Sequence, residues 1–218
     1  MSTERLLAHP LGDSAVTITF GTERSTELLH RIQIAARAIE SARLPAVRDV
    51  VPAYLALTVF YDSLSTTYHE IAEQLLALSG KLPLPDARTA KSRQHVIPVR
   101  YDGMDLEAVS AATNLSTEQV VSIHAGRTYT VDLLGFVPGY AYMSELDTRL
   151  QLPRRPQPRP RVPAGSVAIA AAQTGIYPLE TPGGWHIIGT TAAVMFDPAR
   201  DPPALLAAGD VVRFEVVS

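Results

Sequence analysis

Leu-Gly-Phe-Val-Pro-Gly-Tyr-Ala-Tyr (134–142) and Thr-Pro-Gly-Gly-Trp-His-Ile-Ile-Gly (181–189) bound the stretch of sequence that decides the fold of the second half of this chain. Between them lie an Arg- and Pro-rich run, Val-Pro-Ala-Gly-Ser-Val (162–167) and Gln-Thr-Gly-Ile-Tyr-Pro (173–178). Glycine and proline are unfavourable inside regular elements and useful where the backbone turns sharply or approaches a ligand closely. The stretch therefore predicts short strands joined by tight turns, and it marks the expected working surface.

The predicted strands of this half are short apolar runs separated by turns. They are expected at residues 129–134, 167–171, 186–188, 193–196 and 211–217. Two helices are expected before them, at 105–112 and 116–124, and the second opens with a possible capping box formed by Ser116 and Gln119. Many short strands with Pro and Gly between them favour a closed β-barrel or a sandwich.

The first half of the chain follows a different pattern, in which strand and helix periodicities alternate. Strands are expected at 16–20, 47–51, 54–61 and 94–100, and helices at 28–39 and 71–78. The order β-α-β-β-α-β matches the ferredoxin-like split βαβ arrangement. The segment 81–92, rich in Pro and charge, is interpreted as a linker. We therefore predict an α+β fold, with a small ferredoxin-like domain at 1–90 and a β-barrel domain at 91–218.

The composition excludes several classes of function. The formal net charge of −3 gives no general reason to bind nucleic acid or an anionic membrane. The absence of Cys excludes disulfides and thiolate chemistry, and it fits a reducing compartment. The N-terminus lacks the apolar run of a signal peptide, and no run is long enough to span a bilayer. We expect a cytoplasmic protein without nucleic-acid or membrane partners.

Motifs for nucleotides and metals are missing from the sequence. Neither GxxxxGK[ST] nor GxGxxG occurs, so a phosphate loop or a dinucleotide-binding fold is disfavoured. His95, His124 and His186 lie far apart and no HExxH pattern is present, so we predict no metal site made by this chain alone. Ser166 lacks the second glycine of a nucleophile elbow and is interpreted as a turn residue.

Five arginines lie close together in a proline-rich segment: Arg149, Arg154, Arg155, Arg159 and Arg161. Proline stiffens the backbone, so these guanidinium groups lose less conformational freedom when they bind a ligand. Their forked donors suit carboxylate or phosphate oxygens. The alternative is a solvated loop whose charges have no ligand. We favour an anion site because amide, hydroxyl and aromatic groups follow closely in the sequence.

The candidate substrate-binding residues are Arg154, Arg155, Arg161, Gln173, Thr174, Tyr177 and Trp185. Trp185 follows a tight Gly-Gly turn, and the alternative is a core or interface anchor. His124 is the candidate catalytic acid or base, although a histidine at a helix end more often caps carbonyl groups. Phe136, Tyr140 and Tyr142 could line a pocket or equally pack the floor of the barrel.

Five motifs in this order resemble the allophanate hydrolase subunit 1 family. They are Leu-Gly-Phe-Val-Pro-Gly-Tyr (134–140), Leu-Pro-Arg-Arg (152–155), Pro-Arg-Val-Pro-Ala-Gly-Ser-Val (160–167), Gln-Thr-Gly-Ile-Tyr-Pro (173–178) and Pro-Gly-Gly-Trp-His-Ile-Ile-Gly (182–189). The similarity extends to the N-terminal half through Pro-Leu-Gly-Asp-Ser-Ala (10–15) and Val-Pro-Ala-Tyr (51–54). The family includes the B subunit of the prokaryotic 5-oxoprolinase and the kinase inhibitor KipI. The resemblance implies a small α+β domain followed by a cyclophilin-like β-barrel.

The resemblance also implies work in a complex. It leads us to expect an enzyme subunit, inactive alone, of an ATP-dependent 5-oxoprolinase that opens 5-oxo-L-proline to L-glutamate. The implied partners are a C-type subunit of cyclophilin-like fold and a third, A-type subunit. ATP is expected at a subunit interface, with Mg²⁺. The alternatives are a KipI-like inhibitor of a sensor histidine kinase and a carboxyltransferase-type subunit of a urea amidolyase or biotin-dependent carboxylase, for which alone biotin is expected.

Overall fold

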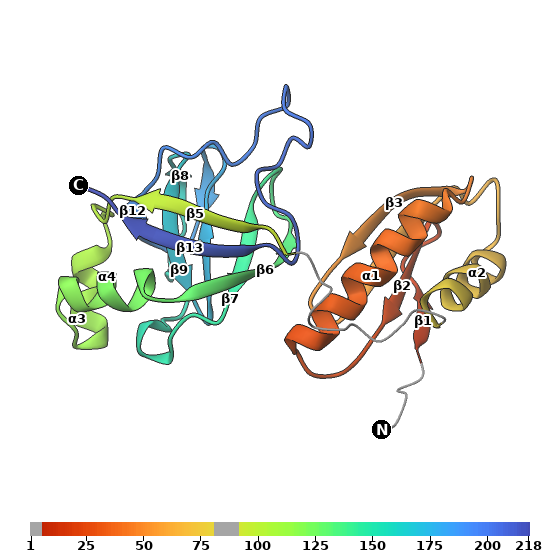
Figure 1. Cartoon of the computed structure of the whole chain (residues 1–218), viewed down its shortest axis with the longest axis horizontal. Helices are drawn as coiled ribbons and strands as arrows, with labels where there is room; N and C mark the ends of the chain where they lie inside the picture. The colour runs from red at the N-terminus through yellow and green to blue at the C-terminus, as the bar shows by residue number, and fades with distance from the viewer. Residues whose placement is uncertain (1–5, 81–91) are drawn as a thin grey trace. The chain divides into compact units, whose positions relative to one another are not determined.

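The computed structural model describes residues 6–80 and 92–218 of the chain. These residues form a mixed α/β protein that divides into two compact units, Met1–Lys91 and Ser92–Ser218 (Figure 1). The segment 81–91, which includes nearly all of the predicted linker, lies outside the described residues. In the described part of the chain, no helix is long and apolar enough to cross a membrane.

The first unit packs two helices on one antiparallel sheet (Figure 1). The strands, in sheet order, are β1 (Leu7–Pro10), β2 (Ala15–Thr19), β4 (Ala56–Tyr61) and β3 (Val47–Pro52), and the helices are α1 (Thr26–Ala42) and α2 (Tyr68–Gly80). Val16 and Ile18 are fully buried in the core that the helices cover. Thr17 lies between them in the strand, and its hydroxyl pairs with that of Thr58 on the neighbouring strand at 3.0 Å. This alternation is what the period-2 pattern of the sequence predicts.

The ferredoxin-like topology predicted for this unit is wrong in one strand. The strand predicted at 94–100 does form, as β5 (Gln94–Val99), but it pairs with β13 (Val211–Val216) in the sheet of the second unit. The position beside β2 is taken instead by β1, which reaches it through a tight turn at residues 11–14. A hairpin between adjacent segments closes a much shorter loop than a strand that must return from residue 94, so it costs less chain entropy.

The second unit is built on a seven-stranded sheet that is almost closed (Figure 1). Its strands, in sheet order, are β12 (His186–Thr190), β9 (Ser166–Ala170), β10 (Gln173–Ile176), β7 (Ala141–Ser144), β6 (Thr128–Leu134), β13 and β5. The two edge strands meet just beyond β5, where Arg100 and Thr190 exchange backbone hydrogen bonds of 2.9 and 2.7 Å. The result is a barrel-like sheet, consistent with the cyclophilin-like barrel that the sequence motifs imply.

Smaller elements complete this unit. They are the helices α3 (Leu106–Thr113) and α4 (Thr117–Ala125), the 3-10 turn η1 (Thr148–Leu150), and a two-stranded ribbon of β8 (Arg159–Val162) and β11 (Thr181–Gly183). All of strand β9 is buried, and its residues alternate between two clusters. Val167 and Ile169 belong to the main core of the barrel, whereas Ala168 and Ala170 pack with Tyr177 and other aromatic side chains on the opposite face. The sheet therefore carries a second, aromatic cluster outside its main core.

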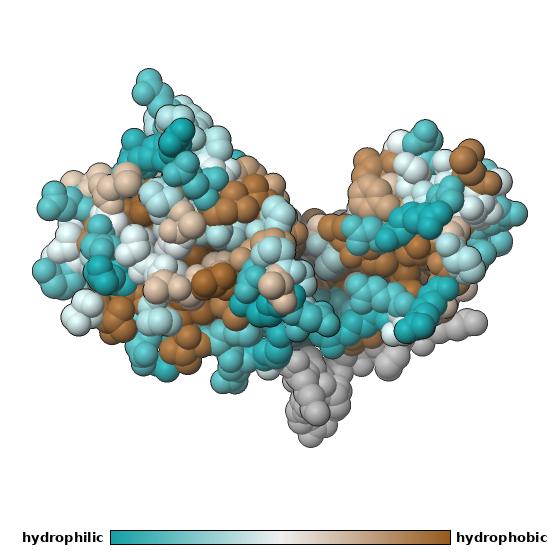
Figure 2. Space-filling model, turned by 90° about the horizontal axis from the view of Figure 1, so that it is seen from above, coloured by the Kyte–Doolittle hydropathy of each residue, from teal (hydrophilic) through white to brown (hydrophobic). Residues whose placement is uncertain are grey.

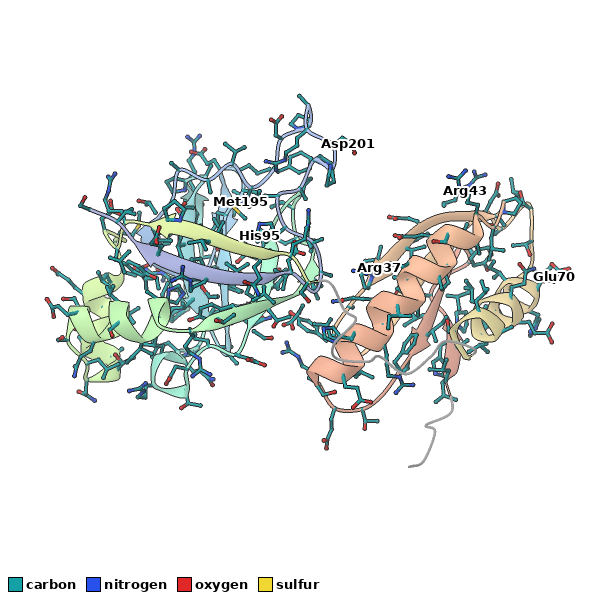
Figure 3. All side chains as sticks on the ribbon, viewed as in Figure 1. Arg37, Arg43, Glu70, His95, Met195 and Asp201 are labelled. Atoms are coloured by element: carbon teal, nitrogen blue, oxygen red, sulfur yellow. The ribbon has the colours of Figure 1, made fainter. Side chains whose placement is uncertain are left out.

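The strand predicted at 193–196 is also wrong. These residues lie in a long loop whose only pairing is an isolated bridge between Phe196 and Ala204. The guanidinium of Arg200 donates to the carbonyls of Val194 and Pro202, so a side chain satisfies groups that a neighbouring strand would otherwise pair. It also donates to the carbonyls of Met195 and Pro203, which accept from backbone N–H groups across the bridge as well. Figure 3 shows Met195 near the sheet and Asp201 on the outer part of the loop. Side-chain capping of carbonyls leaves no pattern in local hydrophobicity.

The predicted capping box at the start of α4 is confirmed. The Ser116 hydroxyl accepts from the Gln119 N–H at 3.2 Å, and the Gln119 side chain accepts from the Ser116 N–H at 2.8 Å. We expect Ser116→Ala to lower the free energy of unfolding by about 1 kcal/mol, because the Gln119 backbone N–H loses the hydroxyl that accepts from it. Urea denaturation followed by the fluorescence of the single tryptophan would measure this loss. Ser122→Ala, the same change inside the same helix and away from its cap, is the control and should cost much less.

Candidate functional site

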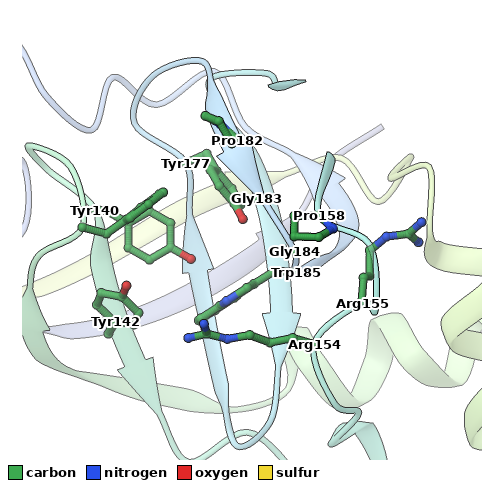
Figure 4. A pocket seen from close by; sticks show the side chains of 11 residues that line it. Tyr140, Tyr142, Arg154, Arg155, Pro158, Tyr177, Pro182, Gly183, Gly184 and Trp185 are labelled. Atoms are coloured by element: carbon green, nitrogen blue, oxygen red, sulfur yellow. The ribbon is translucent and has the colours of Figure 1, made fainter. Parts of the chain in front are cut away.

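A cavity of about 220 Å³ opens beside the aromatic cluster of the second unit (Figure 4). It is lined by Phe136, Tyr140, Tyr142, Arg154, Arg155, Pro158, Tyr177, Pro182, Gly183, Gly184 and Trp185. These residues come from β7 and the turn before it, from the arginine-rich segment before β8, and from the residues between β10 and β12. The Gly- and Pro-rich stretch of the sequence therefore folds around one hollow, and all the lining residues lie within residues 136–185.

The aromatic wall of the cavity is rigid. Tyr140 makes edge-to-face contacts with Tyr177 at 5.2 Å and with Trp185 at 5.8 Å between ring centroids, and it lies 4.9 Å from Tyr142. Such tilted and edge-to-face pairs add about 0.5–1.5 kcal/mol each beyond the area that they bury. Tyr140, Tyr177 and Trp185 are all nearly inaccessible to solvent, so their rings hold one geometry. These side chains therefore pack against one another and also line the cavity, so the two roles considered from the sequence do not exclude each other.

Two glycines make room for the tyrosine hydroxyls. A Cβ at Gly183 would lie 2.2 Å from the Tyr177 hydroxyl, and a Cβ at Gly175 would lie 2.8 Å from the Tyr140 hydroxyl. Burial raises the pKa of Tyr177, against the opposing effect of a hydrogen bond from the Trp185 backbone, so its hydroxyl stays protonated at neutral pH. The aromatic wall thus includes a neutral hydroxyl group, that of Tyr177.

The cavity depends on Asp105, which is almost completely buried at the start of α3. Its carboxylate accepts from Arg155 Nη1 at 2.9 Å, from Arg159 Nη1 at 2.9 Å and Nη2 at 2.6 Å, and from the Ile187 N–H at 2.8 Å. The Asp105 N–H also donates to the Ile187 carbonyl at 2.9 Å. One carboxylate therefore ties α3 to the arginine segment and to β12. Trp185 lies two residues before Ile187, so this junction also positions the cavity wall.

Opposing effects act on the protonation of Asp105. Burial raises its pKa, but the hydrogen bonds from Arg159 and the Ile187 N–H and the charges of Arg159 and Arg155 outweigh burial, and the net shift is downward. The carboxylate is therefore ionised at neutral pH. Two guanidinium groups share it, so the junction keeps a net positive charge.

The two neighbouring arginines have different roles. Figure 4 shows the Arg154 side chain extended beneath Trp185 toward Tyr142, whereas Arg155 points away from the tyrosines. The Arg155 backbone N–H donates to the Gly184 carbonyl at 2.8 Å, and its side chain serves Asp105. Among the described residues, no carboxylate forms an ion pair with Arg154. Arg154 is thus the cation that the cavity offers to a ligand, and the prediction that Arg155 contacts the ligand directly is not supported by this geometry.

The structure does not bring His124 into the cavity. Its ring is fully buried in the main core and stacks on Phe214 at 4.6 Å between centroids. Thr174 Oγ1 donates to the Ala168 carbonyl at 3.1 Å, so it accepts from His124 Nε2 at 2.9 Å. Nδ1 then accepts from the Tyr101 hydroxyl at 2.7 Å. Both ring nitrogens are bonded to groups inside the core and the ring is inaccessible to solvent, so the geometry supports a structural role for His124 rather than the predicted role of acid or base.

Three other predicted site residues also lie outside the cavity lining. Thr174 is buried beside His124, and Gln173 pairs in β10 with strands β7 and β9. Arg161 is largely exposed, with 81% of its side chain accessible, and its nearest carboxylate oxygen, on Glu180, is 3.7 Å away. The structure therefore brings together Arg154, Tyr177 and Trp185 from the predicted set, with Arg155 lining the cavity while its guanidinium serves Asp105.

Sequence reasoning assigned no role to Asp105, because spacing alone pairs it with no partner. Its partners lie 50 to 82 positions later in the chain, and such distances leave no local pattern. In the described part of the chain, no group of three or more His, Cys, Asp or Glu side chains could hold a metal ion. The cavity is therefore a candidate binding site for a small molecule, formed by aromatic rings and one guanidinium.

Together, the two-unit architecture and the cavity beside the barrel-like sheet define a mixed α/β protein with a candidate site for a small molecule. Residues 6–206 match the model of the family described as carboxyltransferase domain, subdomain C and D, and the chain belongs to this family. This match and the relatives described next confirm the resemblance inferred from the five motifs.

Curated relatives match over nearly the whole chain. The 5-oxoprolinase B subunit of Bacillus subtilis (strain 168) is 38% identical over 99% of this chain and 95% of its own length. The protein of the same name from Escherichia coli O157:H7 is 39% identical over 97% of this chain and 96% of its own length.

Solved structures share the fold. TTHA0988, known from a crystal structure, shares 41% sequence identity with this chain at a TM-score of 0.83. The match covers 94% of this chain but only 40% of TTHA0988. The urea amidolyase of K. lactis has a TM-score of 0.81 at 18% identity, and the match covers 98% of this chain and 15% of that protein. The second likeness shows the fold alone.

Proposed function

We propose that this chain is the B subunit of a 5-oxoprolinase, which cleaves 5-oxo-L-proline to L-glutamate together with partner subunits. The observation that carries the proposal is the identity of 36–39% to three proteins of that name over at least 95% of this chain. The sensor-kinase inhibitor and the carboxylase subunit have weaker support, because the curated relatives named here carry the 5-oxoprolinase name. We also propose that the protein is located in the cytoplasm.

The cavity suits the organic substrate better than the nucleotide. Sites for drug-sized ligands have volumes of roughly 300–1,000 Å³, whereas this cavity has about 220 Å³. A triphosphate also needs several converging N–H donors or cations, and Arg154 is the one guanidinium in the lining that no carboxylate of the described residues pairs. The lining residues therefore do not fit ATP. We propose that ATP, with its Mg²⁺, is bound at a subunit interface, mainly by a companion subunit.

A need for partners is supported by a relative of known structure. The counterpart of this chain is a segment of a longer polypeptide in TTHA0988, of which it covers 40%. We propose that the parts supplied there by the same polypeptide are supplied here by separate polypeptides, one a C-type and one an A-type subunit.

Reconstitution tests the division of labour. We expect the purified chain alone to release no glutamate from 5-oxo-L-proline and to hydrolyse no ATP in response to it. Addition of the companion subunits should produce both activities in equal amounts, because uphill ring opening requires coupling to ATP hydrolysis. Glutamate release by the isolated chain would disprove the proposed dependence on partners. An assembled complex that is inactive on 5-oxo-L-proline would disprove the proposed function itself.

A further inference from the structure

We infer that the aromatic cavity binds a small planar lactam that carries a carboxylate, with the Arg154 guanidinium on the carboxylate and the Trp185 and tyrosine rings against the lactam ring. The inference rests on the proposed function and assigns the substrate of the complex to this subunit. It identifies Arg154 as the residue that distinguishes an acid from its neutral analogue.

The charge of the cavity supports an anionic ligand. Among the described residues that line it there are two arginines and no Asp or Glu. The buried Asp105 carboxylate is shared by Arg155 and Arg159, which leaves one positive charge behind the wall. Arg154 adds a second, and no carboxylate of the described residues neutralises it. An isolated anion of complementary shape therefore gains Coulomb energy from both, and the apolar walls strengthen that gain by lowering the local dielectric constant.

The shape of the cavity supports a flat ring. Trp185, Tyr140 and Tyr142 are held by mutual ring contacts, and Pro158 and Pro182 complete the lining. Aromatic and proline rings offer flat apolar surface with few rotatable bonds, so a planar ligand is bound with little loss of side-chain freedom. The neutral hydroxyl of Tyr177 can interact with a lactam without a competing charge.

The size of the cavity limits the ligand to about one ring. At about 220 Å³ it is below the range of sites for drug-sized molecules. A single lactam ring with one carboxylate falls within this limit, whereas a nucleotide or an extended peptide exceeds it.

The test is a comparison of two ligands against two arginine variants. 5-Oxo-L-proline and its primary amide share the lactam ring, and only the first carries a negative charge. Binding to the purified full chain is measured by titration calorimetry and by the fluorescence of Trp185, the single tryptophan. We expect the acid to bind at least about tenfold more tightly than the amide, because hydrogen bonds between charged groups contribute about 1.5–3 kcal/mol and 1.4 kcal/mol is a factor of ten.

Arg154→Gln should remove this preference. The acid should bind about 10- to 100-fold more weakly to the variant, whereas the affinity for the amide should not change. The effect therefore requires both the negative charge of the ligand and the positive charge of the arginine. Arg161→Gln removes the same charge from the same segment at an exposed position outside the cavity lining, and it should leave both affinities unchanged. Far-ultraviolet circular dichroism of both variants checks that the fold is intact.

Several results would overturn the inference. Equal weakening of acid and amide by Arg154→Gln would mean that this arginine shapes the cavity without recognising the carboxylate. A loss of affinity with Arg161→Gln would place the anion elsewhere. If the isolated chain binds neither ligand, the KM of the assembled complex for 5-oxo-L-proline must rise with Arg154→Gln; an unchanged KM would exclude this cavity. If the complex is active and Arg154→Gln leaves its KM unchanged, the binding site inferred here is wrong and the proposed function stands. If the complex is inactive but the isolated chain binds 5-oxo-L-proline, the proposed function is wrong and the binding site stands.

Discussion

Asp105→Asn is expected to lower the free energy of unfolding of the second unit by about 3 kcal/mol, because removal of one member of a buried charge pair leaves the others uncompensated. Arg159 and Arg155 each lose their carboxylate partner, with 21% and 31% of their side chains exposed. An asparagine oxygen can still accept from the Ile187 N–H, but it has no charge to offer two guanidiniums. This loss of stability should be near the lower end of the range of about 3–5 kcal/mol for breaking a buried ion pair, because solvent partly reaches both arginines.

The same substitution should disturb the cavity. Asp105 holds Ile187 two residues after Trp185, and it holds Arg155 next to Arg154. We therefore expect the emission of Trp185 in the folded variant to shift to longer wavelength, together with weaker binding of 5-oxo-L-proline. Asp105 acts here as a positioning residue, since it does not line the cavity.

Asp102→Asn is the matched control for this prediction. Asp102 lies three residues earlier, with 43% of its side chain exposed, and its contacts are a hydrogen bond from Thr190 Oγ1 at 2.8 Å and Arg100 at 3.7 Å. Exposed pairs of this kind contribute about 0–1 kcal/mol. Urea denaturation of both variants, followed by tryptophan fluorescence, measures the difference. Similar losses from the two substitutions would show that Asp105 is not the junction described above.

The second large effect is expected in the pH dependence of stability. Burial lowers the pKa of His124 from 6.5 to about 3 in the folded protein. Below pH 6.5 the unfolded chain binds a proton at this residue that the folded chain does not, so stability is complete above the unfolded pKa and falls as the pH decreases toward the folded pKa. A group with these two values lowers the free energy of unfolding by about 2 kcal/mol between roughly pH 7.5 and pH 5.

The physical cause of this shift is the desolvation of the fully buried ring. His124 donates through Nε2 to Thr174 and accepts through Nδ1 from Tyr101, and a second proton would place a positive charge on a ring that has no contact with solvent. His124→Gln, which cannot titrate, should reduce the change in stability over the same pH range by about 2 kcal/mol.

His69→Gln, in the first unit, is the control and should leave this pH dependence unchanged. Unfolding curves must be recorded by Trp185 fluorescence, which reports on the unit that contains His124. Equal pH dependence in the His124 variant and the unaltered chain would contradict this explanation.

Local elements with a clear period or cap were predictable. The strands at 16–20 and 167–171 and the helix that opens with Ser116 were found within one or two residues, because alternation and capping are properties of a few adjacent residues. Which strand pairs with which was less predictable. Strand β5 has the same local pattern in either unit, and only its six residue pairs with β13 assign it to the barrel-like sheet.

The sequence by itself determined that the Gly-, Pro- and aromatic-rich stretch forms turns and flat apolar walls, and this stretch lines the candidate site. Only the tertiary structure decided which of two neighbouring arginines in the cavity lining is paired with a carboxylate. Arg154 and Arg155 are adjacent and chemically identical, and the choice between them is made by Asp105, fifty positions earlier, which binds one guanidinium and leaves the other in the cavity. Likewise, only packing decided that His124 is a neutral core residue, because desolvation depends on neighbours that are distant in the sequence.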